Sequence, residues 1–233
     1  MVKGAGLPVA LLHGWAGSFR ETWQSTGMDA LLEDGGRKVI GVDLLGHGDA
    51  EKPHDPAAYG ALDEWLLGRL GTVPSAVDAV GFSLGALTLL GALLREPGRF
   101  GRVVLSGIGD RVFEERPADE SRRIVDALEG TGDPADTGSQ VFAGYANAPG
   151  KDKAALTAIM KRPPSPPVDP SAVAEVPNDV LVVIGDKDFA APAERLAAAF
   201  PSGRLVVLRN TDHFATPESF AFIDAVLDFL GAQ

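Results

Sequence analysis

The chain of 233 residues contains no cysteine, which excludes disulfide bonds, thiolate metal sites and a cysteine nucleophile. It also lacks any apolar run near the roughly 20 residues that a membrane-spanning helix needs. Acidic side chains outnumber basic ones by 32 to 21, so the formal net charge is −11. Because nucleic acids and anionic membrane surfaces attract basic proteins, we expect neither as the main partner. The first fifteen residues hold a short apolar run without a signal-type cleavage region, so we expect a cytoplasmic protein.

Short apolar runs alternate along the chain with segments that have helical spacing. The apolar runs predict six strands, over residues 7–13, 37–43, 75–82, 101–109, 178–186 and 203–210. The 3.6-residue periodicity predicts helices over residues 19–35, 57–71, 84–96, 191–201 and 216–232. Strands that are apolar throughout, each followed by a helix, indicate an α/β fold with a mostly parallel central sheet and helices on both faces.

The alternation breaks between Ile108 and Val176, after the fourth predicted strand. This stretch is expected to contain two or three short helices and a stiff connector in its proline-rich part, residues 163–170. Too few large apolar residues lie inside it to form a core of its own. We therefore expect an α/β core made of residues 1–107 and 177–233, with residues 108–176 inserted as a helical cap or lid.

The segment AVGFSLGAL places Ser83 between Gly81 and Gly85, where a predicted strand ends and a helix begins. In a glycine-x-serine-x-glycine turn the serine hydroxyl is exposed above the sheet edge, and larger side chains at the glycine positions would collide with the turn. The backbone N–H of Leu84 then lies at a helix N-terminus, where it can stabilise negative charge. Ser83 is therefore the candidate nucleophile, and the alternative is a small residue tolerated in a tight turn.

A serine hydroxyl is a weak nucleophile, so it needs a histidine base that a carboxylate orients. The chain has only four histidines. His213 follows the last predicted strand, at the sheet edge where the Ser83 turn emerges, and is the expected base. His13 and His47 lie in glycine-flanked turns that they are expected to shape, whereas His54 is expected to be a solvated loop residue.

Three carboxylates end predicted strands between the serine and the histidine, and any of them is a candidate for the acid. They are Asp110, Asp186 and Asp188. The residues alone leave this choice open.

Five segments occur in an order that resembles the α/β-hydrolase superfamily of esterases, lipases, lactonases and C–C bond hydrolases. They are HGW, VDLLGHGDAEKP, VGFSLGAL, VVIGDKDFAAP and TDHF, and the resemblance covers nearly the whole chain outside the insert. The resemblance implies that Asp188 is the acid, with Asp110 as the runner-up and Asp186 shaping its turn. It also implies that the backbone N–H of Trp15 joins that of Leu84 as an oxyanion donor.

In one respect the chain departs from the family pattern. Family members usually begin with an antiparallel strand pair, but only about six residues precede the first predicted strand here. The N-terminal hairpin is therefore expected to be missing, leaving a sheet of about six strands.

The insert also carries large apolar side chains that could roof an acyl site or simply dock the cap onto the sheet. They are Phe113, Phe142, Tyr145, Ile159 and Met160.

Together these features predict a serine hydrolase that cleaves a small ester, thioester or lactone through an acyl-enzyme on Ser83. The expected partner is a small-molecule acyl substrate; no metal or organic cofactor is implied, and the protein is expected to be a monomer or homodimer. Two alternatives remain. The same residues could serve a C–C bond hydrolase or a lyase, or the fold could be a non-catalytic small-molecule receptor.

Overall fold

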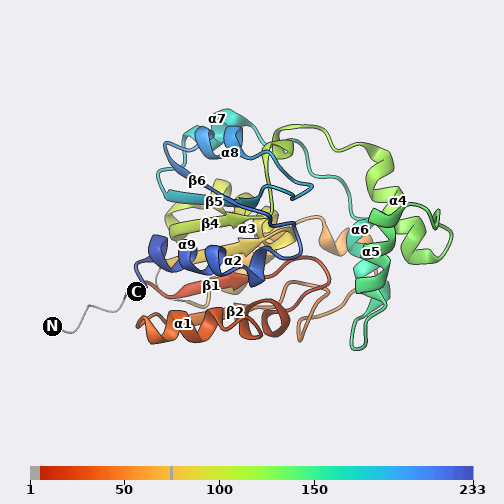
Figure 1. Ribbon diagram of the computed structural model, residues 1–233, viewed down its shortest axis with the longest axis horizontal. Coiled ribbons are helices and arrows are strands. Elements are labelled where there is room, and N and C mark those ends of the chain that lie inside the picture. Colours follow the sequence, from red (N-terminus) through yellow and green to blue (C-terminus); the bar gives the residue numbers. More distant parts are fainter. Residues whose placement is uncertain (1–5, 74–75, 233) are drawn as a thin grey trace.

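A computed structural model describes residues 6–73 and 76–232 (Figure 1). Its sheet has six strands: β1 Val9–Leu12, β2 Val39–Val42, β3 Val77–Phe82, β4 Phe100–Ser106, β5 Asp179–Gly185 and β6 Ser202–Leu208. All pairs are parallel, in the order β2-β1-β3-β4-β5-β6. The predicted α/β class with a parallel sheet is confirmed.

Helices cover both faces of the sheet, and the alternation of side chains along β1 shows why the strands are apolar throughout. Ala10 and Leu12 pack in one apolar cluster with α2 (Leu62–Leu70), α3 (Leu84–Arg95) and α8 (Glu194–Ala199). Val9 and Leu11 pack on the opposite face with two further helices, α1 (Met28–Asp34) and α9 (Phe220–Leu230). Because both faces are buried, neither can be polar.

The sheet begins at β1 in the described part of the chain. Residues 6–8 form no strand, and β2 lies at the sheet edge. The expected absence of an N-terminal hairpin therefore holds for the described residues. Two predictions fall partly outside the described residues. Residues 1–5 belong to the N-terminal segment that was assessed for a signal-type cleavage region, and Ser75 is the predicted start of the third strand.

The prediction of a single helix over residues 19–35 is wrong. A π-helical turn, Arg20–Gln24, is followed by the separate helix α1. Gly27 lies between them with a φ of 77°, a left-handed conformation that interrupts the helix and that glycine adopts without strain. The other predicted helices are real but shorter; residues 56–59 and 216–218, for example, form 3₁₀ turns ahead of α2 and α9.

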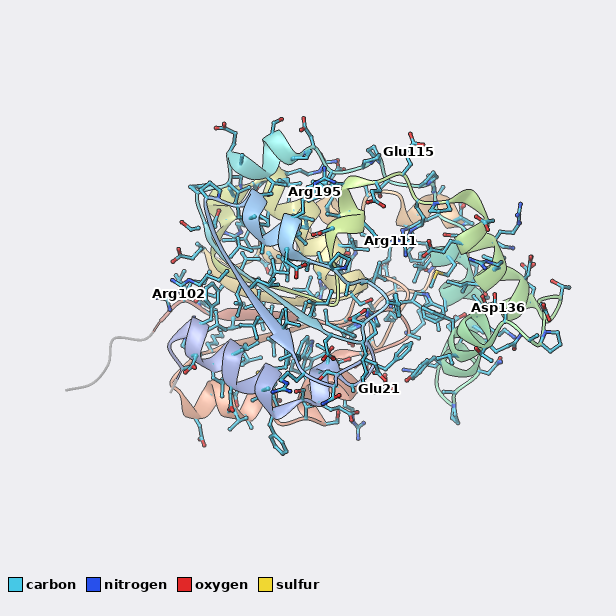
Figure 2. The ribbon with its side chains drawn as sticks, turned by 45° about the horizontal axis from the view of Figure 1, so that its top comes forward. Glu21, Arg102, Arg111, Glu115, Asp136 and Arg195 are labelled. Carbon is cyan, nitrogen blue, oxygen red and sulfur yellow. The ribbon has the colours of Figure 1, made fainter. Side chains whose placement is uncertain are left out.

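The expectation of two or three short helices in the insert is too low, because it contains four α-helices: α4 Ala118–Glu129, α5 Thr137–Ala146, α6 Lys153–Met160 and α7 Pro170–Ala174. The first three lie together beyond the carboxyl ends of the strands, whereas α7 lies beside α8 (Figure 1). Figure 2 shows Asp136, which caps α5, at the far end of the molecule from Arg102 in β4. Buried side chains of α4–α6 join the apolar cluster that contains α2 and α3, so the insert and the sheet share a continuous core.

Within residues 6–73 and 76–232, none of the helices combines the length and the apolar character needed to cross a bilayer.

Candidate active site

Ser83 occupies a strained turn between β3 and α3. Its φ is 52° and its ψ is −113°, a region that residues other than glycine rarely adopt, and its N–H donates to the carbonyl of Ser106 at 2.8 Å. A Cβ atom at Gly81 would lie 2.8 Å from the backbone of α3, and one at Gly85 would lie 2.5 Å from the carbonyl oxygen of His13. Both positions therefore require glycine, as the motif predicts.

His213 and Asp188 meet Ser83 at the carboxyl edge of the sheet. Nε2 of His213 lies 2.9 Å from Oγ of Ser83, and Nδ1 lies 2.9 and 3.0 Å from the two carboxylate oxygens of Asp188. Both side chains are buried, and the carboxylate also accepts the N–H of Ala190 at 2.8 Å. The structure thus joins three residues from distant parts of the sequence in one hydrogen-bonded series.

The other candidate carboxylates have different partners. Asp110 accepts the N–H of Leu196 at 2.8 Å and so caps the first turn of α8, while Nδ1 of His213 is occupied by Asp188. Asp186 accepts the N–H of Thr211 at 3.3 Å and ties its own turn to the loop that carries His213.

The loop after β1 lies directly against the serine. A Cβ atom at Gly14 would lie 3.3 Å from that of Ser83, so the chain just before Trp15 passes close to the serine side chain. Among the described residues, no group accepts a hydrogen bond from the backbone N–H of Trp15 or of Leu84, the first residue of α3. These two donors are therefore available to an oxygen of a bound molecule.

The indole of Trp15 points toward the insert. Its Nε1 donates to the carbonyl of Leu156 in α6 at 3.2 Å, and its ring centroid lies 5.4 Å from that of Phe142 in α5. Trp15 therefore links the loop after β1 to the insert.

Two buried histidines hold this loop in place. Ala16, whose φ is 60°, donates its N–H to Nε2 of His47 at 3.0 Å, and Leu44 donates its N–H to Nε2 of His13 at 3.0 Å. Each imidazole accepts a hydrogen bond at Nε2, so this nitrogen carries no hydrogen and each imidazole is uncharged. Burial lowers the pKa of His13 to about 4, and burial together with the neighbouring His13 holds the pKa of His47 well below its usual value. The two histidines thus shape their turns, as expected, by accepting backbone hydrogen bonds that fix the loop containing Trp15.

Acid is expected to weaken the fold through these histidines. Their folded-state pKa values lie below the unfolded value of 6.5, so the stabilisation is complete above pH 6.5 and is lost as the pH falls below it; for His13 the loss extends to about pH 4. In that window each histidine steepens the fall in the free energy of unfolding by up to about 1.4 kcal/mol per pH unit. Urea denaturation across the window measures this slope. His47→Gln should show a shallower slope, and an equal slope would contradict the assignment.

Aromatic rings surround His213. The centroids of Phe189, Phe82 and Phe214 lie 4.2, 5.0 and 5.4 Å from that of the imidazole. Phe142 of α5 extends the group, at 6.2 Å from Phe214. Of these rings, only Phe142 was singled out from the sequence. The sequence did hold a signal for the other three rings, because each of them directly adjoins Ser83, Asp188 or His213 along the chain.

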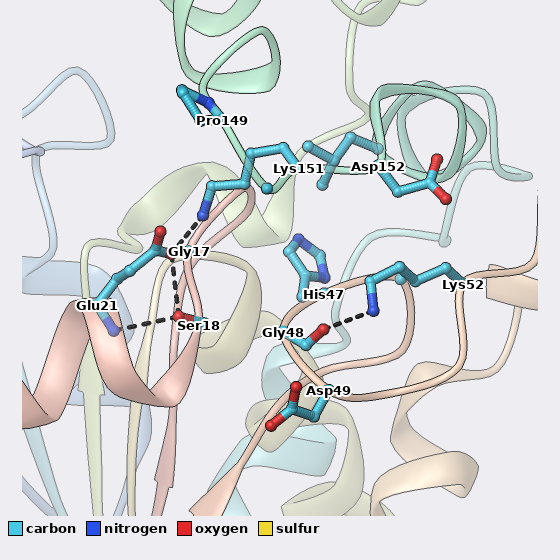
Figure 3. A pocket seen from close by; sticks show the side chains of 13 residues that line it. Gly17, Ser18, Glu21, His47, Gly48, Asp49, Lys52, Pro149, Lys151 and Asp152 are labelled. Atoms are coloured by element: carbon cyan, nitrogen blue, oxygen red, sulfur yellow. Dashed lines mark hydrogen bonds and ion pairs between the residues drawn. The ribbon is translucent and has the colours of Figure 1, made fainter.

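A separate polar pocket of about 220 Å³ opens where the insert meets the loops after β1 and β2 (Figure 3). Lys151 reaches across it to form an ion pair with Glu21, and Ser18 donates to the same carboxylate at 3.0 Å. Nearby, His54 lies 3.1 Å from Asp152. None of Ser83, Asp188 and His213 lines this pocket, so it is distinct from their site.

No group of three or more histidine, aspartate or glutamate side chains in the described ranges is placed so that it could hold a metal ion.

The sequence profile of the Alpha/beta hydrolase family matches residues 9–225. The chain belongs to the alpha/beta hydrolase family. The resemblance seen in the sequence is therefore confirmed.

Solved structures of other hydrolases share the fold. An enol-lactonase from Burkholderia xenovorans aligns with a TM-score of 0.76 and 22% identity over 99% of this chain and 94% of its own. An esterase from Exiguobacterium antarcticum aligns with a TM-score of 0.75 and 21% identity, over 98% of this chain and 93% of its own.

Among curated relatives, a 2-hydroxy-6-oxo-2,4-heptadienoate hydrolase from Pseudomonas putida is 35% identical over 117 residues, which are 48% of this chain and 41% of that protein. An sn-1-specific diacylglycerol lipase from Mus musculus is 37% identical over 109 residues, 45% of this alpha/beta hydrolase and 34% of the lipase. The matched segments thus span less than half the length of these curated relatives.

Proposed function

We propose that this alpha/beta hydrolase cleaves an ester, thioester or lactone through an acyl-enzyme formed on Ser83. The observation that carries the proposal is the hydrogen-bonded series from Ser83 through His213 to Asp188, with 2.9 Å between serine Oγ and imidazole Nε2. A base within hydrogen-bond reach of a hydroxyl, itself oriented by a carboxylate, is the arrangement that activates a serine. We also propose a cytoplasmic enzyme with a small-molecule substrate.

In the acylation step, Oγ of Ser83 attacks the carbonyl carbon while Nε2 of His213 takes its proton. Asp188 accepts the Nδ1–H, which fixes the tautomer that leaves Nε2 free to accept and stabilises the imidazolium that forms. Negative charge develops on the carbonyl oxygen, beside the free N–H groups of Trp15 and Leu84. A donor aimed at such an oxygen contributes about 3 kcal/mol to transition-state stabilisation.

In the following steps, His213 returns the proton to the leaving oxygen, and the alcohol or thiol departs. Ser83 keeps the acyl group as an ester. His213 then deprotonates a water molecule, which attacks that ester and releases the carboxylic acid. The scheme uses only side chains and backbone groups of this chain.

We propose that residues 108–176 act as the cap of this site, over a core of residues 1–107 and 177–233. The hydrogen bond from Trp15 to Leu156 and the ring contact with Phe142 support this role, because both join the insert to the loop beside Ser83.

A second candidate is hydrolysis of a C–C bond. It is supported by the partial match to the Pseudomonas putida hydrolase, whose named substrate carries a ketone and a carboxylate but no ester. The same serine, histidine and oxyanion donors could act at that ketone.

Trapping the intermediate tests the proposal. After brief exposure to p-nitrophenyl acetate and an acid quench, mass spectrometry should find one acetyl group on the peptide that contains Ser83. A parallel assay offers a 2-hydroxy-6-oxo-dienoate. Turnover of the dienoate without turnover of any ester would favour the second candidate, and binding of either compound without turnover would favour a receptor.

A further inference from the structure

Three exposed aromatic side chains adjoin the candidate site, and we call them the aromatic patch: Tyr145 of α5, Phe189 after β5 and Phe214 after β6. They are 45%, 53% and 38% exposed. The ring of Tyr145 stacks on that of Phe214 at 5.1 Å, and Phe189 lies 6.3 Å from Phe214. Large apolar side chains that gather on a surface mark a place where another molecule binds.

The aromatic patch lies on the histidine side of the site. Phe189 and Phe214 contact the ring of His213, with centroids 4.2 and 5.4 Å from it. The free N–H groups of Trp15 and Leu84 belong instead to the loop after β1 and to the start of α3. The patch and the two free N–H groups therefore belong to different elements of the fold.

This placement assigns the two halves of an ester to different surroundings. The carbonyl oxygen must lie at the free N–H groups, whereas the leaving oxygen must lie within reach of Nε2 of His213, which protonates it. The group attached to that leaving oxygen then extends past the rings that contact His213. The patch offers it aromatic faces, which suit an alkyl or aryl group.

We infer that the aromatic patch binds the alcohol part of the substrate, and that the enzyme selects esters of apolar alcohols by the size of this group. The inference rests on the proposed acyl-enzyme mechanism and names the substrate class of the same site. The bonds that form and break are those of acylation: Ser83 gains the acyl group, and the apolar alcohol leaves with the proton from His213.

A series of acetate esters tests this inference. Ethyl, butyl and hexyl acetate all give the same acetyl-enzyme, and their alcohols are similar leaving groups, so differences in kcat/KM report recognition of the alcohol part. Burial of one methylene corresponds to about a fourfold gain. We expect kcat/KM to rise about threefold to fourfold per methylene in this series, and less steeply in ethyl esters with lengthened acyl chains.

Two variants locate the selectivity. Tyr145→Ala and Phe189→Ala should each reduce the rise to less than about twofold per methylene. Tyr145 is the cleaner test because its ring contacts Phe214 rather than His213. The matched control is Phe220→Ala, which removes an aromatic ring that is 84% exposed at the start of α9 and should leave the rise unchanged.

The outcomes separate the inference from the proposed function. A flat alcohol series, a steeper acyl series, or a rise that survives both patch variants would overturn the inference, while acetylation of Ser83 would still support the mechanism. Absence of both ester turnover and acetylation would overturn the mechanism and the inference together.

Discussion

Replacement of Ser83 with alanine is expected to lower kcat/KM for every ester substrate by about 10⁴- to 10⁶-fold. Without Oγ no acyl-enzyme forms, and only the oxyanion donors and substrate binding still accelerate the attack of water. Alanine fits the space that serine occupies, so the turn between β3 and α3 should persist. The measurement is the initial rate of ester hydrolysis, with the circular dichroism spectrum and Tm as evidence of folding.

The control for this variant is Ser171→Ala, at an exposed position of α7. It should retain the wild-type rate. If Ser83→Ala kept even a tenth of the wild-type kcat/KM, the hydroxyl would not be the nucleophile.

Replacement of Asp188 with asparagine is expected to lower kcat by about 10⁴-fold. The amide can donate toward Nδ1 of His213, which favours the tautomer whose Nε2 carries a hydrogen and cannot accept the proton of Ser83. The shape of the side chain is nearly unchanged, so substrate binding, followed through KM, should change far less than kcat.

Asp110→Asn is the matched control for this substitution. Its remaining carbonyl oxygen can still accept the N–H of Leu196, so the cap of α8 and the catalytic rate should be retained. The opposite pattern, in which Asp110→Asn loses activity and Asp188→Asn keeps it, would move the acid to the end of β4.

The tight turn at Ser83 could be predicted because its constraints are local. Gly81, Ser83 and Gly85 lie within five residues, and each glycine is required by a backbone approach of 2.8 Å or less. The position of His213 followed from topology, since loops that leave the carboxyl ends of parallel strands share one edge of the sheet.

The residues alone could not decide which carboxylate lies against His213. Asp110 and Asp188 both follow a strand, and they differ only in hydrogen-bond partners that are distant in the sequence. Asp110 accepts the N–H of Leu196, whereas Asp188 lies against Nδ1 of His213. The sequence pattern describes the strand ends but not the direction that each side chain takes beyond them.

The aromatic patch could not be predicted from the sequence either, because it also depends on long-range packing. Tyr145 contacts Phe214 only because α5 docks beside the loop after β6.

The prediction of one helix over residues 19–35 was wrong at Gly27. An isolated glycine within a helical pattern can either be tolerated or end the helix, and the pattern alone does not decide between the two.

The most direct test of an activated Ser83 is the intact mass of the protein after treatment with a fluorophosphonate, which reacts with activated serines. The account predicts a single adduct on the wild-type protein and none on Ser83→Ala under the same conditions. A folded wild-type protein that remains unlabelled, or an adduct that persists in Ser83→Ala, would contradict it.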